Sequence, residues 1–429
     1  MSERRPRLLA SNVFYSPLSF GGATTVAENM CRLLQEQHGW DVVVFTQSKA
    51  PHLFPNMLHR YLAGSVEVIS AKLANHLSAE DVYRNPEFAA QVDDVIDAIE
   101  PDIVHYHCVQ DIGAGIVDPV ARRGIPLAVT IHDCWWLCER QFMIRPDGRY
   151  CHQVKIDPSV CRFCVDDLTS TRARSAYLRQ QLDKATRLIF PSDFHRQLHV
   201  ANGFSEDRCF TNKNGVRMPG PDFSKTPVDD PKVKVRFGFV GGPGPIKGGP
   251  QIARAFQDIK RSDYELKIVD AAKHIGLSWR NDDEWKLRGK VTFVDPYTSD
   301  TMDEFFAGVD VLLFPSQWKE SFGLTVREAM ARGIWVIAAD AGGLSEDCID
   351  GVNARVIPMS ADHTQLTAAI LEALDMDHSK VAPSPHVVSI EDQAADLDRQ
   401  LREMLAAKGR PESAKVQTAE PGHAASLAD

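Results

Sequence analysis

No stretch of the 429-residue sequence is apolar over the roughly 18 consecutive residues that a bilayer span requires. The first 15 residues carry the positive charge of a signal peptide, but Ser11, Asn12 and Tyr15 interrupt their apolar run. This segment therefore predicts a first β-strand, and we expect a cytoplasmic protein. Peripheral contact with the inner face of a membrane stays open, because counting residues does not detect it.

The sequence also lacks an excess of basic charge. Its 48 Lys and Arg residues are outnumbered by 58 Asp and Glu residues, which gives a net charge of -10. This balance argues against a general binder of polyanions, so we expect no nucleic-acid partner. Nine cysteines are present, but in a cytoplasmic chain they are not expected to form a disulfide framework.

Apolar runs alternate with helical patterns in the first half. A chain of this length exceeds one ordinary core, so two domains of about 200 residues each are expected. The strand-like runs are 7–14, 41–46, 102–108, 127–133 and 187–192. Amphipathic helices are predicted between them, at 23–37 and 87–100. Strands that alternate with helices indicate a parallel sheet covered by helices on both faces.

The second half repeats this rhythm after a turn-rich linker at 212–232. Its strand-like runs are 235–241, 264–270, 290–295, 309–316 and 334–340. The predicted fold class is therefore α/β, with two Rossmann-like doubly wound domains at 1–210 and 211–390. A helical pattern follows at 391–407, and residues 408–429 have the composition of a disordered tail.

Glycine-rich loops follow the first strand of each half, and ligands of open α/β sheets bind beyond the carboxyl ends of strands. Gly21 and Gly22 would let the backbone approach a ligand closely, at the start of a helix whose N–H groups are free. A tight strand-to-helix turn without a ligand explains these glycines equally well. The second loop, VGGPGPIKGG, spans residues 240–249.

This second loop matches neither common phosphate-binding template. A dinucleotide-binding G-x-G-x-x-G would need glycine at Lys247, and a Walker A loop would place its lysine after a glycine rather than before Gly248. A nicotinamide-dependent oxidoreductase is therefore not expected. A glycine-rich turn, a cation and a helix start suit a diphosphate bound without a metal ion. The alternative is a Gly/Pro turn that carries a solvated lysine.

Two glutamates, Glu320 and Glu328, bracket a Ser-Phe-Gly-Leu turn after the apolar run 309–316. Free N–H groups of residues 322–324, at the start of the next helix, would form a polarised anion site. Carboxylates beside such a site can accept hydrogen bonds from sugar hydroxyls. Taken singly, Glu320 also fits a residue placed to favour the helix dipole, and Glu328 a solvated helix position.

His132 and Asp133 close the apolar run 127–133. A histidine at the end of a strand is more often structural than catalytic. This one lies where a cleft facing the other three loops would need its chemical groups, which favours a functional role.

Together these motifs resemble the retaining family-4 glycosyltransferases of GT-B fold, over roughly residues 5–407. The strongest match is the stretch from Glu320 to Glu328, ESFGLTVRE, which resembles the family's E-x7-E motif. Further similar segments, in the family's order, are 21–22, 132–133, 211–216, 239–249 and 340–356. The resemblance implies two domains that face each other across a cleft, and a C-terminal helix at 391–407 that packs back on the first domain.

The resemblance also implies roles for individual residues. Glu328 resembles the residue that holds the donor's ribose, and Glu320 the residue that contacts the sugar hydroxyls. Lys247 matches the diphosphate cation, and His132 matches the residue near the reacting anomeric centre. The expected catalytic residues are thus His132, Glu320 and Lys247, and no cofactor is required for catalysis. The expected donor-binding residues are Gly21, Gly22, Gly241, Gly242, Ser321, Phe322, Gly323, Leu324 and Glu328.

The sequence departs from the family pattern at two positions. Family members often carry an arginine where this sequence has Gly242, so one of two expected cations is missing. Donor binding is then either weaker or completed by another residue. Ile334 stands where the family commonly has proline, a change of smaller consequence.

The implied reaction moves a sugar from a nucleoside-diphosphate sugar to a hydroxyl acceptor by front-side displacement, with retention of anomeric configuration. The expected acceptors are saccharides, lipid-linked molecules or other hydroxyl compounds, in the assembly of bacterial polysaccharides or glycoconjugates. Two other functions stay open. One is a catalytically silent homologue that binds a sugar nucleotide or scaffolds other enzymes, and the other is a nonhydrolysing sugar-nucleotide epimerase, which has a similar two-domain architecture.

Four cysteines gather in a predicted insertion at 134–168. Cys138, Cys151, Cys161 and Cys164 have the spacing C-x12-C-x9-C-x2-C, whose end resembles a structural zinc site. A Pro-Asp-Gly turn between the first two predicts a hairpin-like insertion held by the metal. We therefore predict a structural zinc ion that shapes the acceptor site, with Cys134 and His152 as spare ligands. The alternative is a set of free thiols.

Overall fold

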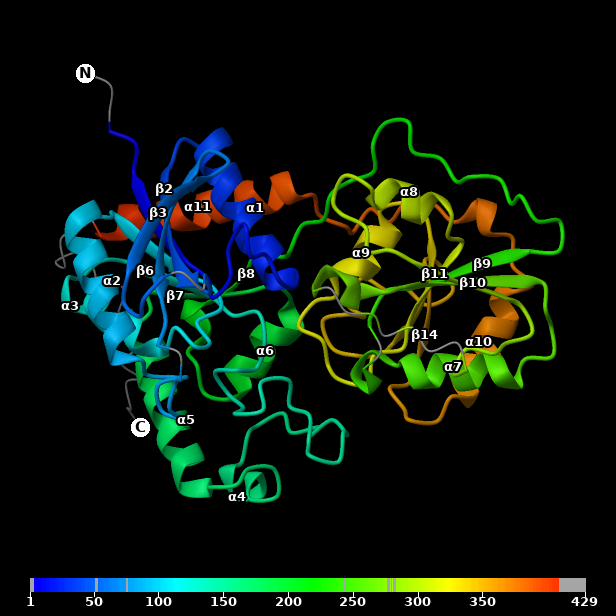
Figure 1. Ribbon diagram of the computed structural model, residues 1–429, viewed down its shortest axis with the longest axis horizontal. Coiled ribbons are helices and arrows are strands. Elements are labelled where there is room, and N and C mark those ends of the chain that lie inside the picture. The colour runs from blue at the N-terminus through cyan, green and yellow to red at the C-terminus, as the bar shows by residue number, and fades with distance from the viewer. Residues whose placement is uncertain are drawn as a thin grey trace, which may run out of the picture.

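The computed structural model describes residues 4–50, 53–74, 76–242, 244–275, 278, 280 and 283–408. These residues form two α/β lobes that lie side by side, with the N-terminal half of the chain in one lobe and most of the C-terminal half in the other (Figure 1). Within these ranges, no helix combines the length and the apolar character needed to cross a bilayer.

The first lobe is built on an eight-stranded sheet of order β3-β4-β2-β1-β5-β6-β7-β8. Its strands are β1 (Arg7–Ser11), β2 (Asp41–Ser48), β3 (Leu58–Ala63), β4 (Val66–Lys72), β5 (Ile103–Tyr106), β6 (Leu127–Thr130), β7 (Arg187–Phe190) and β8 (Cys209–Thr211). Neighbours pair in parallel except β3, which is antiparallel to β4. The apolar runs of the sequence do not reveal β3, because it is a mostly exposed edge strand, and they also miss β4 and β8.

Helices cover this sheet because each presents one apolar face. The α-helices of the first lobe are α1 (Gly22–Gln37), α2 (Pro86–Ile99), α3 (Val117–Arg122), α4 (Pro158–Cys161), α5 (Leu168–Asp183) and α6 (Asp193–Ala201). In α1 the apolar stripe formed by Val26, Met30, Leu33 and Leu34 is buried, as its helical spacing predicts.

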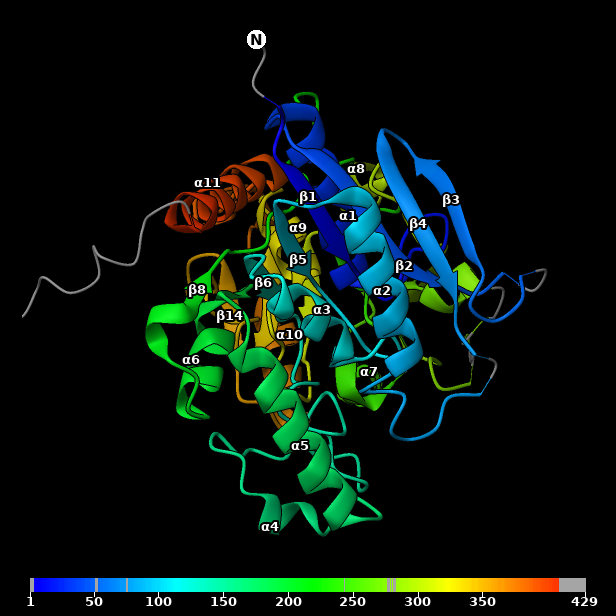
Figure 2. The same cartoon turned by 90° about the vertical axis from the view of Figure 1, so that its left-hand side faces the viewer.

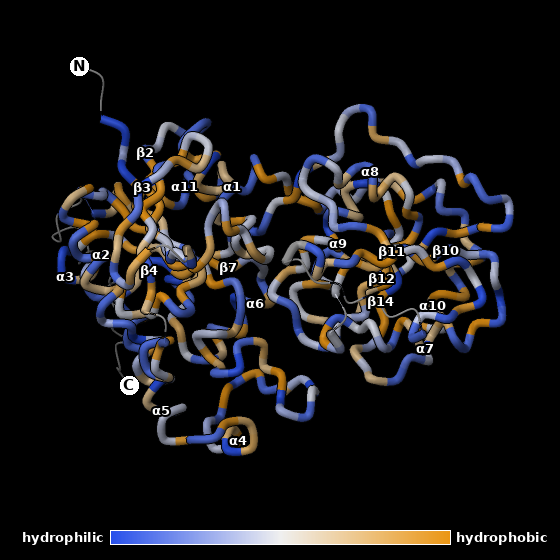
Figure 3. Tube along the Cα trace, in the orientation of Figure 1, coloured by the Kyte–Doolittle hydropathy of each residue, from blue (hydrophilic) through white to orange (hydrophobic). Residues whose placement is uncertain are grey.

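The second lobe has a six-stranded, fully parallel sheet of order β11-β10-β9-β12-β13-β14. Its strands are β9 (Val235–Phe239), β10 (Tyr264–Val269), β11 (Lys290–Val294), β12 (Val311–Phe314), β13 (Trp335–Ala339) and β14 (Ala354–Ile357). Its α-helices are α7 (Gly249–Asp258), α8 (Met302–Ala307), α9 (Leu324–Met330) and α10 (Thr364–Ala373). The hydrophobic colour in Figure 3 concentrates on the central strands of both lobes, where the cores lie.

Short 3₁₀ helices connect several of these elements. They are η1 (Ala114–Ile116), η2 (Glu206–Arg208), η3 (Pro245–Lys247), η4 (Ala271–Ile275) and η5 (His378–Lys380).

The last helix, α11 (Ile390–Lys408), crosses back to the first lobe and lies beside α1 (Figures 1 and 2). Leu397 and Leu401 are buried in one cluster with residues of α1 and β1. The Nε1 of Trp40 donates a hydrogen bond of 2.7 Å to Oδ1 of Asp398. These contacts tie the end of the chain to its beginning, in agreement with the predicted returning helix. Lys408 still belongs to α11, and the rest of the predicted tail, 409–429, lies outside the described residues.

One boundary differs from its predicted place. β8 pairs with β7 as far as Thr211, so the first sheet extends one residue past the expected end at 210. The predicted linker then runs over the second lobe, where Gly220 N–H donates to Asp303 and Thr226 N–H donates to the carbonyl of Ala307. The two parallel-sheet lobes confirm the predicted class, a pair of Rossmann-like α/β units.

Candidate functional site

A cleft of about 820 Å³ lies between the two lobes, and residues of both lobes line it. On the first-lobe side the cleft is lined by residues at or just after the ends of β1, β5 and β6. On the second-lobe side it is lined by residues at or just after the ends of β9, β10, β11 and β12. The cleft therefore lies at carboxyl strand ends, where parallel sheets bind ligands, and its volume suits a small-molecule substrate. The predicted site residues that line it are Gly21, Gly22, His132, Lys247, Glu320, Ser321, Phe322, Gly323, Leu324 and Glu328.

The Gly21-Gly22 loop brings the first lobe against the second. Gly21 has a φ of 82°, in a region that disfavours side chains. A Cβ on Gly22 would lie 3.0 Å from Cδ1 of Leu324, which begins α9 on the other side of the cleft. Gly22 therefore permits the close approach of the two lobes, whereas Gly21 permits the φ of the turn.

Lys247 and Glu320 form an ion pair within the cleft. The Nζ of Lys247, in η3, donates to Oε1 of Glu320 at 2.7 Å, and the Oγ of Ser316 donates to the same oxygen at 2.8 Å. Glu320 is held in place by its backbone, because its N–H donates to the carbonyl of Ala341. The side chain of Glu320 is only 7% exposed, so the pair is poorly screened by solvent.

A buried cation supports the turn that carries Ser321 to Leu324. The guanidinium of Arg327 is fully buried and forms an ion pair of 2.8 Å with Asp347. It also donates to the carbonyl oxygens of Phe322, Gly343 and Leu344. Arg327 stands inside the predicted E-x7-E stretch without a predicted role, and its contacts hold the turn in shape from behind.

Glu328 lies deeper in the cleft than a solvated helix position would. Its Oε2 accepts a hydrogen bond of 3.2 Å from the hydroxyl of Tyr297, whose ring stacks on Phe305. Burial raises the pKa of Glu328 to about 7, although nearby Arg332 and the Tyr297 hydroxyl favour the ionised form. This carboxyl therefore changes its charge near neutral pH.

His132 is buried at the edge of the cleft and bonded to a second histidine. Its Nε2 lies 3.0 Å from Nδ1 of His107, and the two rings are stacked. Burial lowers the pKa of His132 to about 3 and the pKa of His107 well below its usual value, so both rings are neutral. His132 can therefore offer hydrogen bonds, but it brings no positive charge.

The neighbouring carboxyl, Asp133, is held by three donors. Its Oδ1 accepts from the N–H of Trp135 at 2.8 Å, and its Oδ2 accepts from Gln110 at 3.1 Å and from Gln141 at 2.6 Å. Burial raises the pKa of Asp133 despite these bonds. Gln110, Gln141 and Asp133 all line the cleft.

Gly241 and Gly242 are not part of the cleft lining, unlike the other predicted donor-binding residues. A Cβ on Gly241 would lie 2.9 Å from Cβ of Lys247 and 2.8 Å from the ring of Phe239, so this glycine makes room for the loop itself. Val240 and Lys247 are the residues of this loop that reach the cleft. Among the described lining residues, Lys247 is the only Lys or Arg.

Comparison with known proteins identifies the family. The family profile described as Glycosyltransferase Family 4 matches residues 20–218, and that of Glycosyl transferases group 1 matches residues 224–385. The chain belongs to the family-4 type of glycosyltransferases. The two matches follow each other along the chain and correspond to its two lobes.

The curated relatives match this chain over only part of their own length. Lipopolysaccharide 1,2-N-acetylglucosaminetransferase of Salmonella typhimurium is 31% identical over 119 residues, 27% of each chain. D-inositol 3-phosphate glycosyltransferase of Nocardia farcinica is 28% identical over 199 residues, 42% of this chain and 43% of the relative. The chain thus spans less than half the length of both.

Solved structures share the whole fold. Sucrose-phosphate synthase from Thermosynechococcus elongatus has a TM-score of 0.67 at 18% identity and covers 94% of this chain and 100% of its own. HepE from Anabaena, in complex with UDP, has a TM-score of 0.57 at 16% identity with the same coverage. At these identities the likeness shows the fold, which is the GT-B arrangement of glycosyltransferases.

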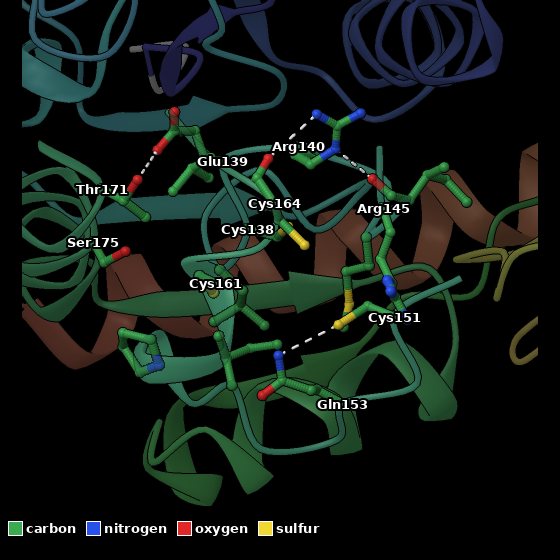
Figure 4. Close-up of a pocket in the computed structure, with 16 residues that line it drawn as sticks. Cys138, Glu139, Arg140, Arg145, Cys151, Gln153, Cys161, Cys164, Thr171 and Ser175 are labelled. Carbon is green, nitrogen blue, oxygen red and sulfur yellow. Dashed lines mark hydrogen bonds between the residues drawn. The ribbon is translucent and has the colours of Figure 1, made fainter. Parts of the chain in front are cut away.

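The four cysteines predicted to bind zinc line a cavity in the insertion at 134–168 (Figure 4). This cavity is separate from the cleft. The hairpin expected there is reduced to one antiparallel bridge between Ile144 and Tyr150. Gln153 donates a hydrogen bond of 3.3 Å to the sulfur of Cys151. The pKa of Cys138 is raised to about 11, mainly by burial and to a smaller extent by the neighbouring Cys161 and Cys151 thiols.

The side-chain arrangement in this insertion bears on the predicted zinc site. Within the described ranges, no three His, Cys, Asp or Glu side chains are arranged to hold a metal ion. Cys138, Cys151, Cys161 and Cys164 share a cavity without converging on one point, and a thiol with a raised pKa must also lose its proton to bind zinc. Zinc binding by these four cysteines stays a prediction.

Several residues of the cleft escaped the sequence prediction. Tyr297 follows β11 directly, so the carboxyl-end rule applied to the run 290–295 would have pointed to it. His107 follows β5 in the same way, although it contacts His132 and does not itself line the cleft. Trp318 follows the run 309–316 and obeys the same rule. Gln141 and Phe142 gave no such signal, because their place depends on how the insertion meets the second lobe.

Proposed function

We propose that this chain transfers a sugar from a nucleoside-diphosphate sugar to an acceptor hydroxyl with retention of anomeric configuration. The proposal rests above all on one observation: Lys247, Glu320, Glu328 and His132 line a single cleft between two Rossmann-like lobes. These residues come from separate loops and offer one cation, two carboxylates and a neutral imidazole. That combination suits a donor with a diphosphate and many hydroxyl groups.

Each group has a place on such a donor. Lys247 meets the diphosphate, whose negative charge grows as it leaves, so its contact strengthens in the transition state. Glu320 accepts hydrogen bonds from the sugar hydroxyls and orients the sugar, and Glu328 accepts them from the ribose. His132 lies near the anomeric carbon as a neutral hydrogen-bonding group.

The reaction is a front-side displacement. The bond between the anomeric carbon and the diphosphate oxygen breaks while the acceptor oxygen bonds to the same face of the sugar. The proton of the acceptor hydroxyl passes to the departing diphosphate oxygen, so no cofactor is consumed. Entry and departure on one face retain the anomeric configuration.

The acceptor is a saccharide, a lipid-linked molecule or another hydroxyl compound of bacterial polysaccharide or glycoconjugate assembly. Support comes from two relatives, a lipopolysaccharide 1,2-N-acetylglucosaminetransferase and a D-inositol 3-phosphate glycosyltransferase. We place the reaction in the cytoplasm. A lipid-linked acceptor would bring the protein to the inner face of the membrane.

A panel of sugar nucleotides tests this function. Purified protein is screened by thermal shift against UDP-glucose, UDP-N-acetylglucosamine, GDP-mannose and ADP-glucose, because a ligand that binds the folded state raises the melting temperature. The stabilising donor is then incubated with saccharide and lipid-linked acceptors, and the anomeric configuration of the product is read by NMR. An inverted product contradicts retention, and the absence of any product with intact donor binding contradicts transfer.

A catalytically silent sugar-nucleotide binder is the second candidate. Two observations favour it: the position of the missing arginine is Gly242, and the remaining cation, Lys247, is already paired with Glu320. Such a protein would be stabilised by a donor in the same screen yet transfer nothing. An epimerase would instead convert the donor into a second sugar nucleotide without an acceptor.

A further inference from the structure

The insertion at 134–168 reaches from the first lobe to the second. The ring of Phe142 lies 4.9 Å from the ring of Trp318, at an interplanar angle of 68°. Trp318 belongs to the second lobe, between β12 and Glu320, and is buried in one apolar cluster with Cys134, Met143 and other residues of the first lobe. In Figure 1, α4 of the same insertion lies at the lower edge of the first lobe.

The residue before Phe142 contacts the opposite side of the same cleft. Gln141 donates a hydrogen bond of 2.6 Å to Asp133, the residue next to His132. Two consecutive residues of the insertion therefore contact both lobes, one beside the proposed anomeric centre and the other beside the proposed diphosphate site. Both residues line the cleft.

On the second lobe, Trp318 supports the cation of the cleft. The Nζ of Lys247 lies 5.4 Å from the centre of the Trp318 ring, within the range of a cation–π contact. The same Nζ donates to Glu320. A contact chain thus runs from Phe142 through Trp318 to Lys247 and Glu320, and only its first member belongs to the first lobe.

The backbone around Phe142 adopts an unusual conformation. Gln141 and Met143, on either side of it, both have a φ of 56°, in the left-handed region that residues other than glycine seldom occupy. Hydrogen bonds hold this conformation: Gln141 N–H donates to the carbonyl of Cys138 at 2.9 Å, and Cys151 N–H donates to the carbonyl of Met143 at 2.8 Å. Such conformations persist where surrounding contacts impose them, and they gather at functional sites.

We propose that the insertion is a latch between the lobes, in which Phe142 seats on Trp318 and thereby positions Lys247 for the donor's diphosphate. Phe142 is a positioning residue, since it acts through Trp318. The latch holds the lobes together around the cleft, and it separates when they part. The positioning of Lys247 for a donor rests on the proposed function, whereas the contact that holds the lobes together does not.

Phe142→Ala tests the latch, with Phe163→Ala as the matched control. Phe163 lies in the same insertion, but its side chain is largely exposed and is not part of the cleft. Small-angle scattering gives the radius of gyration of each variant, and calorimetry gives its affinity for inorganic pyrophosphate, a probe for the site of Lys247. We expect Phe142→Ala to raise the radius of gyration and to weaken pyrophosphate binding about threefold to tenfold, the worth of one aromatic pair.

A conservative variant separates positioning from folding. Phe142→Tyr keeps the ring and should restore both values, and the melting temperature of all variants identifies any that fail to fold. With an active donor, Phe142→Ala should raise KM more than it lowers kcat. The latch is refuted if folded Phe142→Ala matches the Phe163→Ala control in radius of gyration and in pyrophosphate affinity. If the radius of gyration rises in Phe142→Ala while the protein turns over no sugar nucleotide, the latch stands and the proposed function fails.

Discussion

The Nζ of Lys247 lies 2.7 Å from the Oε1 of Glu320, so the proposed diphosphate cation and the proposed sugar-binding carboxylate are partners of each other. The side chain of Glu320 is nearly buried, and the hydroxyl of Ser316 donates a further hydrogen bond to the same oxygen. Each group therefore holds the other in position. A donor that contacts both does so across an existing ion pair rather than between two independent groups.

Lys247→Ala should lower kcat/KM by about 10²-fold to 10³-fold, the loss typical of removing one group that stabilises transition-state charge. It also leaves the nearly buried Glu320 without its cation, so the melting temperature should fall. Steady-state kinetics and thermal unfolding check the two effects.

Glu320→Gln is the matched control, because its amide oxygen can still accept from Lys247 and Ser316 while the charge is lost. It should be more stable than Lys247→Ala and still slow. Normal turnover in either variant would contradict the assigned roles.

Donor binding should strengthen as pH rises through about 7, the pKa to which burial raises Glu328. Below that value the carboxyl is protonated and offers the ribose hydroxyls a poorer acceptor. Above it, the ionised group accepts their hydrogen bonds. The donor KM, measured one pH unit to either side of about 7, should therefore be higher on the acid side.

Glu328→Gln should abolish this pH dependence and hold KM near the acid-side value, because its amide resembles the protonated acid. Tyr297→Phe removes the hydroxyl that favours the ionised form, so the KM transition should move to higher pH. An unchanged pH profile in Glu328→Gln would assign the titration to another group.

The rule that ligands meet carboxyl strand ends predicted much of the cleft from sequence alone. Lys247, Glu320 and His132 each follow an apolar run, and the structure brings all three together. The rule works because parallel strands in one sheet end at one edge, whatever the loops contain. Gly241 and Gly242 show its limit, since position after a strand does not say which way a loop residue faces.

Contacts between segments that are distant in the sequence could not be predicted. Phe142 meets Trp318, and Trp40 meets Asp398, over long separations in sequence, and no local pattern encodes the partner of either. Edge strand β3 was missed for a different reason, because its exposed residues show no continuous apolar run. Packing between distant segments requires the assembled fold.

Metal analysis should decide the state of the insertion's thiols. If Cys138, Cys151, Cys161 and Cys164 bind zinc, protein purified without added metal should contain about one zinc per chain, as a four-thiolate site requires. Chelation should then lower the melting temperature. Cys161→Ser should reduce the zinc content, while Cys209→Ser, outside the insertion, should leave it unchanged. Folded protein with a zinc content near zero would establish free thiols.

His107→Phe should slow the reaction without destabilising the protein. The substitution keeps an aromatic ring beside His132 but removes its only hydrogen-bond partner at Nε2 among the described residues. The tautomer of His132 is then free, whereas the bond to His107 holds its Nε2 and leaves Nδ1 available to a ligand. One hydrogen bond contributes about 1 kcal/mol, so kcat should fall about threefold to tenfold while the donor KM changes little.

The Nε2 of His107 explains why stability should survive this change. It is buried without a hydrogen-bond partner, and an unpaired buried polar atom costs free energy in the folded state. Replacing the imidazole by phenyl removes that cost together with the bond to His132, so the melting temperature should stay within a few degrees. Unchanged kcat in His107→Phe would show that His132 needs no partner, and a large loss of stability would give His107 a structural role instead.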